Sequence, residues 1–154
     1  MQRNKHTTIT PNLIAMLRRE FALEWDGIHG APHWARVRRN GLRIAAVTKA
    51  STRVVELFAF LHDARRLHDG GDREHGARAA LLVRELGAAQ LAISGEEAEL
   101  LAYACRHHSD GLIEADVTVQ TCWDADRLDL GRVGIRPDPE RLCTAVAKGF
   151  CFDP

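Results

Sequence analysis

Histidine and aspartate residues recur along this chain in groups that could hold a metal ion. The stretch FLHDARR, residues 60–66, ends an apolar run with His62 and Asp63, and two arginines follow at once. The other groups are His29 with His33, the single His75, His107 with His108, and Asp124 with Asp126. Imidazole and carboxylate donors suit Mn, Fe, Co, Ni or Zn better than Ca. A polar helix end is common, so the hypothesis of a metal site depends on the whole set.

A cluster of such donors would support hydrolysis of a phosphate ester. A carboxylate between two imidazole groups can bridge two metals about 3.5–4 Å apart, the spacing used for that reaction. His29 and His33 share one helix face if the helical phase extends back through Pro32. The adjacent His107 and His108 would point about 100° apart on a regular helix. Both reach one site only if the pocket wraps around the helix end, or if one binds metal and the other binds substrate.

The elements that must position these side chains are predicted to be helices. Apolar spacing and capping residues predict helices over residues 11–24, 32–50, 53–63, 73–87, 94–108, 117–130 and 139–150. No convincing strand alternation appears. The fold class is therefore all-α, a compact single domain of about six or seven helices over residues 1–154, with a loosely held segment at 1–10. Each histidine group lies near a predicted helix boundary, so the helix ends must converge.

Length, charge and cysteine content limit which binding partners and which cellular compartment are expected for this protein. A length of 154 residues suits one domain, and the formal net charge of zero disfavours nucleic acid as a partner bound through a basic surface. The sequence has no apolar run of about 18 residues, so no membrane span is predicted. The first ten residues have no hydrophobic signal core, and the four cysteines form no C-x-x-C pair. We therefore predict a cytoplasmic protein with reduced cysteines.

Five motifs, taken in order, resemble the HD superfamily of metal-dependent phosphohydrolases. They are HWARV at 33–37, FLHDARR at 60–66, EHGARAALL at 74–82, HHSDG at 107–111 and DADRLDLGRVGI at 124–135. The resemblance implies an HD-type domain that binds one or two divalent ions, which could be Mn, Fe, Co, Ni, Zn or Mg. It implies a metal quartet of His33, His62, Asp63 and Asp126. It also implies a second metal held by His75, His107 and His108, with Asp63 as the bridge.

The resemblance also suggests roles for individual residues. Asp126 is preferred over Asp124 as the ligand because the family's aspartate typically precedes Arg-Leu, as Asp126 does here. Asp124 stays the alternative. The predicted catalytic residues are Asp63, His107 and His108, and His29 is predicted to bind substrate. Arg65 and Arg66 are also predicted to bind substrate, because guanidinium groups pair well with phosphate oxygens.

The predicted function is hydrolysis of a phosphate ester or anhydride, with a nucleotide-like phosphorylated small molecule as substrate. Monoester, diester and pyrophosphate chemistry are left open, as is a homo-oligomeric state. The double histidine is followed by SDGLIEAD rather than by the Gly-Tyr-Pro signature of the cyclic-dinucleotide phosphodiesterases, which disfavours cyclic di-GMP. The alternatives are a metal-dependent nuclease, a non-catalytic module that senses a nucleotide, and a diiron oxygenase of the HD type.

Overall fold

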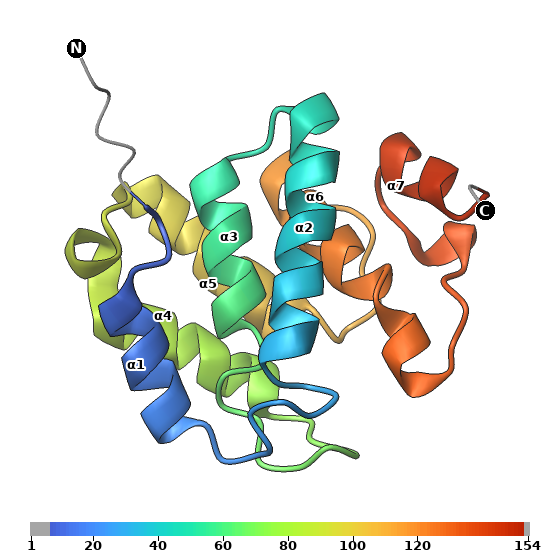
Figure 1. Ribbon diagram of the computed structural model, residues 1–154. Helices are drawn as coiled ribbons and strands as arrows, with labels where there is room; N and C mark the ends of the chain where they lie inside the picture. Colours follow the sequence, from blue (N-terminus) through green and yellow to red (C-terminus); the bar gives the residue numbers. More distant parts are fainter. Residues whose placement is uncertain (1–6, 153–154) are drawn as a thin grey trace.

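Helices form all the regular secondary structure in the part of the chain that the computed structural model describes, residues 7–152 (Figure 1). The elements are α1 (Pro11–Glu20), α2 (Ala31–Thr48), α3 (Thr52–Leu61), α4 (His75–Leu91), α5 (Gly95–His107), α6 (Val117–Arg127), the short 3-10 helices η1 (Leu130–Val133) and η2 (Pro139–Arg141), and α7 (Ala145–Phe150). The predicted all-α class is confirmed. No helix within this range is long and apolar enough to cross a lipid bilayer.

Helix α3 is the centre of the core, and it packs against α2, α4, α5 and α6 (Figure 1). Its apolar side chains are almost completely removed from solvent, with Leu57 and Phe58 both at 0% exposure. Burial of one such side chain contributes about 1.5–3 kcal/mol. Gly41 of α2 approaches α3 so closely that a Cβ atom there would clash with the side chain of Val55. Helix α3 is therefore closely packed on α2, and this packing sets the position of the polar pair that follows it.

Side-chain caps fix the starts of α1, α3 and α5, as well as those of α6 and α7. The Thr10 hydroxyl accepts a hydrogen bond from the Leu13 amide at the start of α1, and Ser51 accepts one from Val54 at the start of α3. Ser94 and Glu97 form a capping box at the start of α5. The Ser51 hydroxyl also donates to Glu97 at 2.8 Å, which joins the caps of α3 and α5.

Three predicted helices differ from the observed ones. Helix α4 does not end at Gly87 as predicted, but continues to Leu91 across a kink at Gly87, where φ is 78°. Helix α1 ends at Glu20, not near residue 24, because Phe21 has an extended backbone with ψ of 124°. The single helix predicted over residues 139–150 is wrong, because Leu142, Cys143 and Thr144 separate η2 from α7. The amides of Cys143 and Thr144 donate to the buried Asp124 carboxylate instead of forming helical hydrogen bonds. A distant side chain thus overrides the local pattern.

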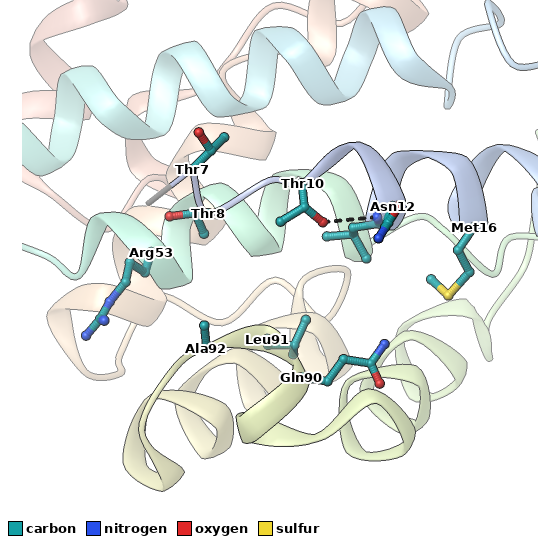
Figure 2. A pocket seen from close by; sticks show the side chains of 10 residues that line it. Thr7, Thr8, Thr10, Asn12, Met16, Arg53, Gln90, Leu91 and Ala92 are labelled. Atoms are coloured by element: carbon teal, nitrogen blue, oxygen red, sulfur yellow. Dashed lines mark hydrogen bonds between the residues drawn. The ribbon is translucent and has the colours of Figure 1, made fainter. Parts of the chain in front are cut away.

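The segment leading into α1 borders a hollow that is separate from the histidine groups. Residues 1–6 of the predicted loose segment lie outside the described residues, whereas Ile9 is buried. A hollow of about 600 Å³ lies between this segment, the start of α3 and the end of α4 (Figure 2). Its lining consists of Thr7, Thr8, Thr10, Asn12, Leu13, Met16, Arg53, Gln90, Leu91 and Ala92. Among the described residues that line it there is no histidine, cysteine or carboxylate, so this part of the lining does not resemble a metal site.

Candidate metal centre

Five helix ends meet at the candidate metal centre. Each supplies a histidine or an aspartate: His33 in the first turn of α2, His62 directly after α3, His75 at the start of α4, His108 directly after α5, and Asp126 in the last turn of α6. Asp63 follows His62 and lies within 3.5 Å of all four of these histidines. The bundle therefore brings together residues that are separated by more than ninety positions in the sequence.

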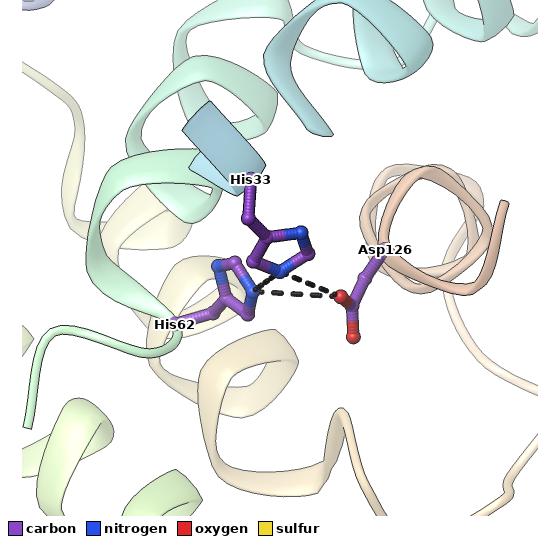
Figure 3. A group of neighbouring side chains, drawn as sticks. All are labelled: His33, His62 and Asp126. Atoms are coloured by element: carbon purple, nitrogen blue, oxygen red, sulfur yellow. Dashed lines mark hydrogen bonds and ion pairs between the residues drawn. The ribbon is translucent and has the colours of Figure 1, made fainter. Parts of the chain in front are cut away.

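The first group of ligand atoms comes from α2, α3 and α6 (Figure 3). Nε2 of His33 lies 3.1 Å from Nε2 of His62 and 3.2 Å from Oδ1 of Asp126. Oδ2 of Asp63 lies 3.5 Å from Nε2 of both histidines. Both rings are completely buried, and the Asp126 side chain is 13% exposed. We call His33, His62, Asp63 and Asp126 the first ligand group.

The second group uses the other oxygen of Asp63. Oδ1 of Asp63 lies 3.4 Å from Nε2 of His75 and 3.4 Å from Nε2 of His108, and these two nitrogens are 2.9 Å apart. A Cβ atom at Gly76 would lie only 2.5 Å from the carbonyl oxygen of Arg106. The start of α4 therefore rests directly on the end of α5, and this close contact brings the two rings together. Asp63, His75 and His108 form the second ligand group.

The outer ring nitrogen of each histidine fixes the direction of the inner one. The Nδ1 atoms of His33, His62, His75 and His108 contact Asp129 Oδ2, the Phe58 carbonyl, the Asp72 carbonyl and the Cys105 carbonyl, respectively. A carbonyl oxygen can only accept, so a proton sits on Nδ1 in the last three rings. The Nε2 atoms therefore all face the centre, and this orientation by outer partners is typical of metal-ligating histidines.

Unpartnered polar atoms provide a direct test of whether a metal fits here. Among the described residues, four buried side-chain nitrogen or oxygen atoms lack a hydrogen-bond partner, and all four belong to this centre: His29 Nδ1, Arg66 Nε, Asp126 Oδ1 and Arg132 Nε. Buried polar groups without partners are rare in proteins and require an explanation. His29 Nδ1 and Asp126 Oδ1 are potential ligand atoms beside other ligand atoms, so the residues present fit a bound cation.

Close packing of acids and imidazoles shifts the pKa values of the metal-free centre. Burial disfavours the charged ring of His33, but hydrogen bonds to Asp126, Asp129 and Asp63 outweigh burial and raise its pKa to about 10. Burial and the neighbouring His108 lower the pKa of His75 to about 4. Against the effect of burial, the histidines hold the pKa values of Asp63 and Asp126 well below 3.8. Without metal, the proton on His33 therefore provides part of the positive charge that a bound cation would supply to the carboxylates.

Metal affinity is accordingly expected to rise with pH. A metal at the first ligand group must displace the His33 proton, so affinity should increase by about tenfold per pH unit between pH 6 and 8 for each proton released. Calorimetric titration with Mn²⁺ in buffers of different ionisation enthalpy measures that proton release. An affinity independent of pH over this range would contradict the prediction.

The stability of the metal-free fold should decrease as the pH rises on the alkaline side, whereas metal affinity should increase. Because the folded pKa of His33 is raised from 6.5 to about 10, its contribution to stability is complete below pH 6.5 and is lost as the pH rises towards 10. The lowered pKa values of Asp63 and Asp126 give a contribution that is present above pH 3.8 and is lost on acidification. Urea unfolding in a chelator at several pH values measures both trends.

The structure does not bring every predicted site residue to the centre. His107 contacts Asp110 at 2.6 Å and the ring of Tyr103, and Arg65 pairs with Glu85 at 2.6 Å. Asp124 is completely buried, but its oxygens accept hydrogen bonds from Cys143 and Thr144. We therefore place His107, Arg65 and Asp124 outside the ligand groups.

His29 and Arg66, which were predicted to bind substrate, do lie at the centre. Nδ1 of His29 is 3.4 Å from Oδ2 of Asp63, and Nε of Arg66 is 3.4 Å from Oδ1 of Asp63. Nε2 of His29 donates to the Asp69 carbonyl, so Nδ1 is its inward-facing nitrogen. His29 thus uses the opposite ring nitrogen from the other histidines.

Sequence reasoning missed Asp129, which orients His33. Oδ2 of Asp129 lies 2.7 Å from Nδ1 of His33, and Oδ1 accepts a hydrogen bond from Nε of Arg36 at 2.8 Å. Asp129 lies three residues after Asp126, in the same motif DADRLDLGRVGI. This spacing of three residues from Asp126 could have indicated that Asp129 lies near the site. The sequence alone did not show that its carboxylate contacts a ring 96 positions away.

Replacing Asp129 with asparagine should weaken metal binding while leaving the ligands in place. An amide cannot accept from both Arg36 and His33 through two oxygens, so the His33 ring loses its orientation. Loss of such an outer partner typically costs about 10- to 100-fold in metal affinity. Mn²⁺ titration of Asp129→Asn measures this, with Glu140→Gln on the exposed part of the same segment as the control. Equal affinities of the two variants would show that Asp129 does not orient the ring.

Comparisons with known proteins support the fold. No protein-family model matches the chain, and no curated protein matches its sequence. A crystal structure of a predicted HD superfamily hydrolase from an uncultured Thermotogales bacterium matches with a TM-score of 0.72 and 24% identity. The match covers 91% of this chain and 81% of that chain. The chain therefore has the HD-domain fold that its motifs resemble, and its cluster of histidines and aspartates fits such a domain.

Proposed function

We propose that this chain is a metal-dependent phosphohydrolase that uses two divalent ions. The observation that carries the proposal is the position of Asp63. Its Oδ2 faces His33 and His62, whereas its Oδ1 faces His75 and His108. A carboxylate shared by two imidazole groups is the arrangement that binds a pair of metals for displacement at phosphorus.

The protein residues have separable tasks in this proposal. Bound divalent metal would polarise a phosphoryl oxygen and lower the pKa of a water molecule. Asp63 belongs to both ligand groups and keeps their separation fixed. Asp129 fixes the orientation of the His33 ring. Arg66, with its side chain 13% exposed beside Asp63, is placed to stabilise negative charge that develops on the phosphoryl oxygens.

A small phosphate ester or anhydride, nucleotide-like in character, is the proposed substrate. The formal net charge of zero supports a small molecule over a nucleic acid, because nucleic-acid affinity depends on a basic surface. The nucleotide character rests on the resemblance of the five motifs to the HD superfamily. A panel of nucleoside mono-, di- and triphosphates, beside simple phosphoesters and single-stranded RNA, tests the substrate class directly.

The adjacent histidines of α5 provide a matched pair of variants for the two-metal hypothesis. His108→Gln should reduce bound Mn²⁺ from about two ions per chain to about one, whereas His107→Gln should retain about two, because only His108 faces Asp63. Metal analysis of each purified variant measures the stoichiometry, and the phosphoester panel under Mn²⁺, Mg²⁺, Co²⁺ and Ni²⁺ measures activity. His108→Gln should lose most of that activity.

Two results would contradict the proposed function. One is a wild-type protein that hydrolyses no member of the panel with any of the four metals. The other is equal metal content in both histidine variants, which would remove the two-metal arrangement. Oxygen consumption by the Fe²⁺-loaded protein, with no hydrolysis, would favour the oxygenase alternative instead.

A further inference from the structure

Arg132 is a nearly buried cation at the centre to which no role has been given so far. It lies in η1, and its side chain is only 10% exposed. Nη1 donates to the carbonyl oxygen of Asp129 at 2.9 Å, and Nη2 lies 3.7 Å from Oδ1 of Asp126, beyond hydrogen-bond distance. Nε is buried and has no partner. A guanidinium carries five donor hydrogens, so most of its hydrogen-bonding capacity is unused here.

This position is unfavourable for a residue that only balances the charge of Asp126. A buried charge requires close pairing and hydrogen bonds, and the nearest carboxylate oxygen is not within hydrogen-bond distance. Asp126 also belongs to the first ligand group, so a cation held there would compete for the same oxygen. The two positive charges would then repel each other unless an anion lay between them.

A second arginine has an equivalent place at the other ligand group. Nε of Arg66 lies 3.4 Å from Oδ1 of Asp63, the oxygen that faces His75 and His108, and it also lacks a hydrogen-bond partner. Arg132 lies beside the carboxylate of the first ligand group and Arg66 beside the carboxylate oxygen of the second. The centre thus presents one partly unsatisfied guanidinium next to each group, and planar guanidinium groups suit phosphate oxygens.

We infer that Arg132 binds a non-bridging oxygen of the substrate's phosphoryl group at the first ligand group. This inference rests on the proposed function and deepens it, because it assigns a substrate-binding role to a residue of η1. The carbonyl of Asp129 holds the guanidinium in place from one side, which leaves Nη2 directed towards the centre. Arg132 therefore acts on the bound phosphoryl group and not on the metal ligands.

The test measures binding of inorganic phosphate and of Mn²⁺ separately. In the Mn²⁺-loaded protein, Arg132→Gln should weaken phosphate binding by roughly 10- to 100-fold, the loss expected for a hydrogen bond to a charged group. Arg132→Lys should give a smaller loss, because it keeps the charge but not the planar donor pair. The exposed Arg136, four residues further on, provides the control Arg136→Gln, which should stay within about twofold of the wild type.

The Mn²⁺ titration separates substrate binding from a structural role. Removing a positive charge beside Asp126 should leave Mn²⁺ affinity unchanged or increase it, so phosphate affinity should fall while Mn²⁺ affinity does not. Joint loss of both affinities in Arg132→Gln would show a structural role and overturn the inference, as would unchanged phosphate affinity. If the wild type neither binds phosphate nor hydrolyses any phosphoester, the proposed function itself fails. Wild-type activity with an unaffected Arg132→Gln overturns only the role of Arg132.

Discussion

Replacing Asp63 with asparagine should lower phosphohydrolase activity by about a thousandfold or more and reduce bound metal to less than one ion per chain. Asparagine keeps the size of the side chain but has one weak oxygen ligand in place of two charged ones. Since the two oxygens of Asp63 face different ligand groups, one substitution damages both. A thousandfold loss corresponds to about 4 kcal/mol of transition-state stabilisation.

The same substitution should destabilise the metal-free fold at neutral pH. Burial opposes the charge of Asp63, but His62, His108, His29 and His33 hold its pKa well below 3.8, so the carboxylate stabilises the folded chain above that pH. Removing one partner of a buried ion pair typically costs about 3–5 kcal/mol. Urea unfolding in a chelator measures the loss, and Asp110→Asn, at an acid that is 52% exposed, is the matched control. Full metal content in Asp63→Asn would contradict the bridging role.

The second large effect concerns two aspartates of α6 that lie two residues apart. Asp126→Asn should lose metal from the first ligand group and at least about a hundredfold of activity, because Oδ1 of Asp126 faces His33 and His62. Asp124→Asn should keep its metal and its activity per folded molecule. Its cost appears in stability, because its oxygens accept three hydrogen bonds from Cys143 and Thr144 at 2.7–2.8 Å.

The loss in Asp124→Asn should be about 3 kcal/mol, since hydrogen bonds to charged groups each contribute about 1.5–3 kcal/mol and the amide keeps some of them. It should also be local. Hydrogen exchange at the amides of Cys143 and Thr144 should accelerate, while the amides of α3 stay protected. If instead Asp124→Asn lost metal and Asp126→Asn kept it, the assignment of the two residues would be reversed.

Local sequence was sufficient where the deciding interaction spans only a few residues. The side chains of Thr10, Ser51 and Ser94 accept hydrogen bonds from amides three positions away. The local residue order therefore predicts where α1, α3 and α5 begin. The order of the five motifs likewise indicated which fold to expect. The sequence left open which histidine of the 107–108 pair faces inward; the structure places His108 beside Asp63 and His107 beside Asp110.

The pairing of distant side chains required the tertiary structure. Helical phase allows both Asp124 and Asp126 to face neighbouring elements. Only the packing of α6 against α2, and of residues 143–144 against Asp124, separates the candidate ligand Asp126 from the structural anchor Asp124. Asp129 and Arg132 were missed for the same reason.

The sequence by itself thus determined most of the helices, the starts of those with N-terminal caps, and the set of candidate ligands. These features depend on interactions within one or two helical turns. The tertiary structure decided which candidates share a centre. Close contacts between helices, such as that at Gly76, set the separation of the helix ends to within the few ångströms that metal ligation requires. No periodicity in the chain encodes that separation, because it depends on how side chains from different helices fill the space between them.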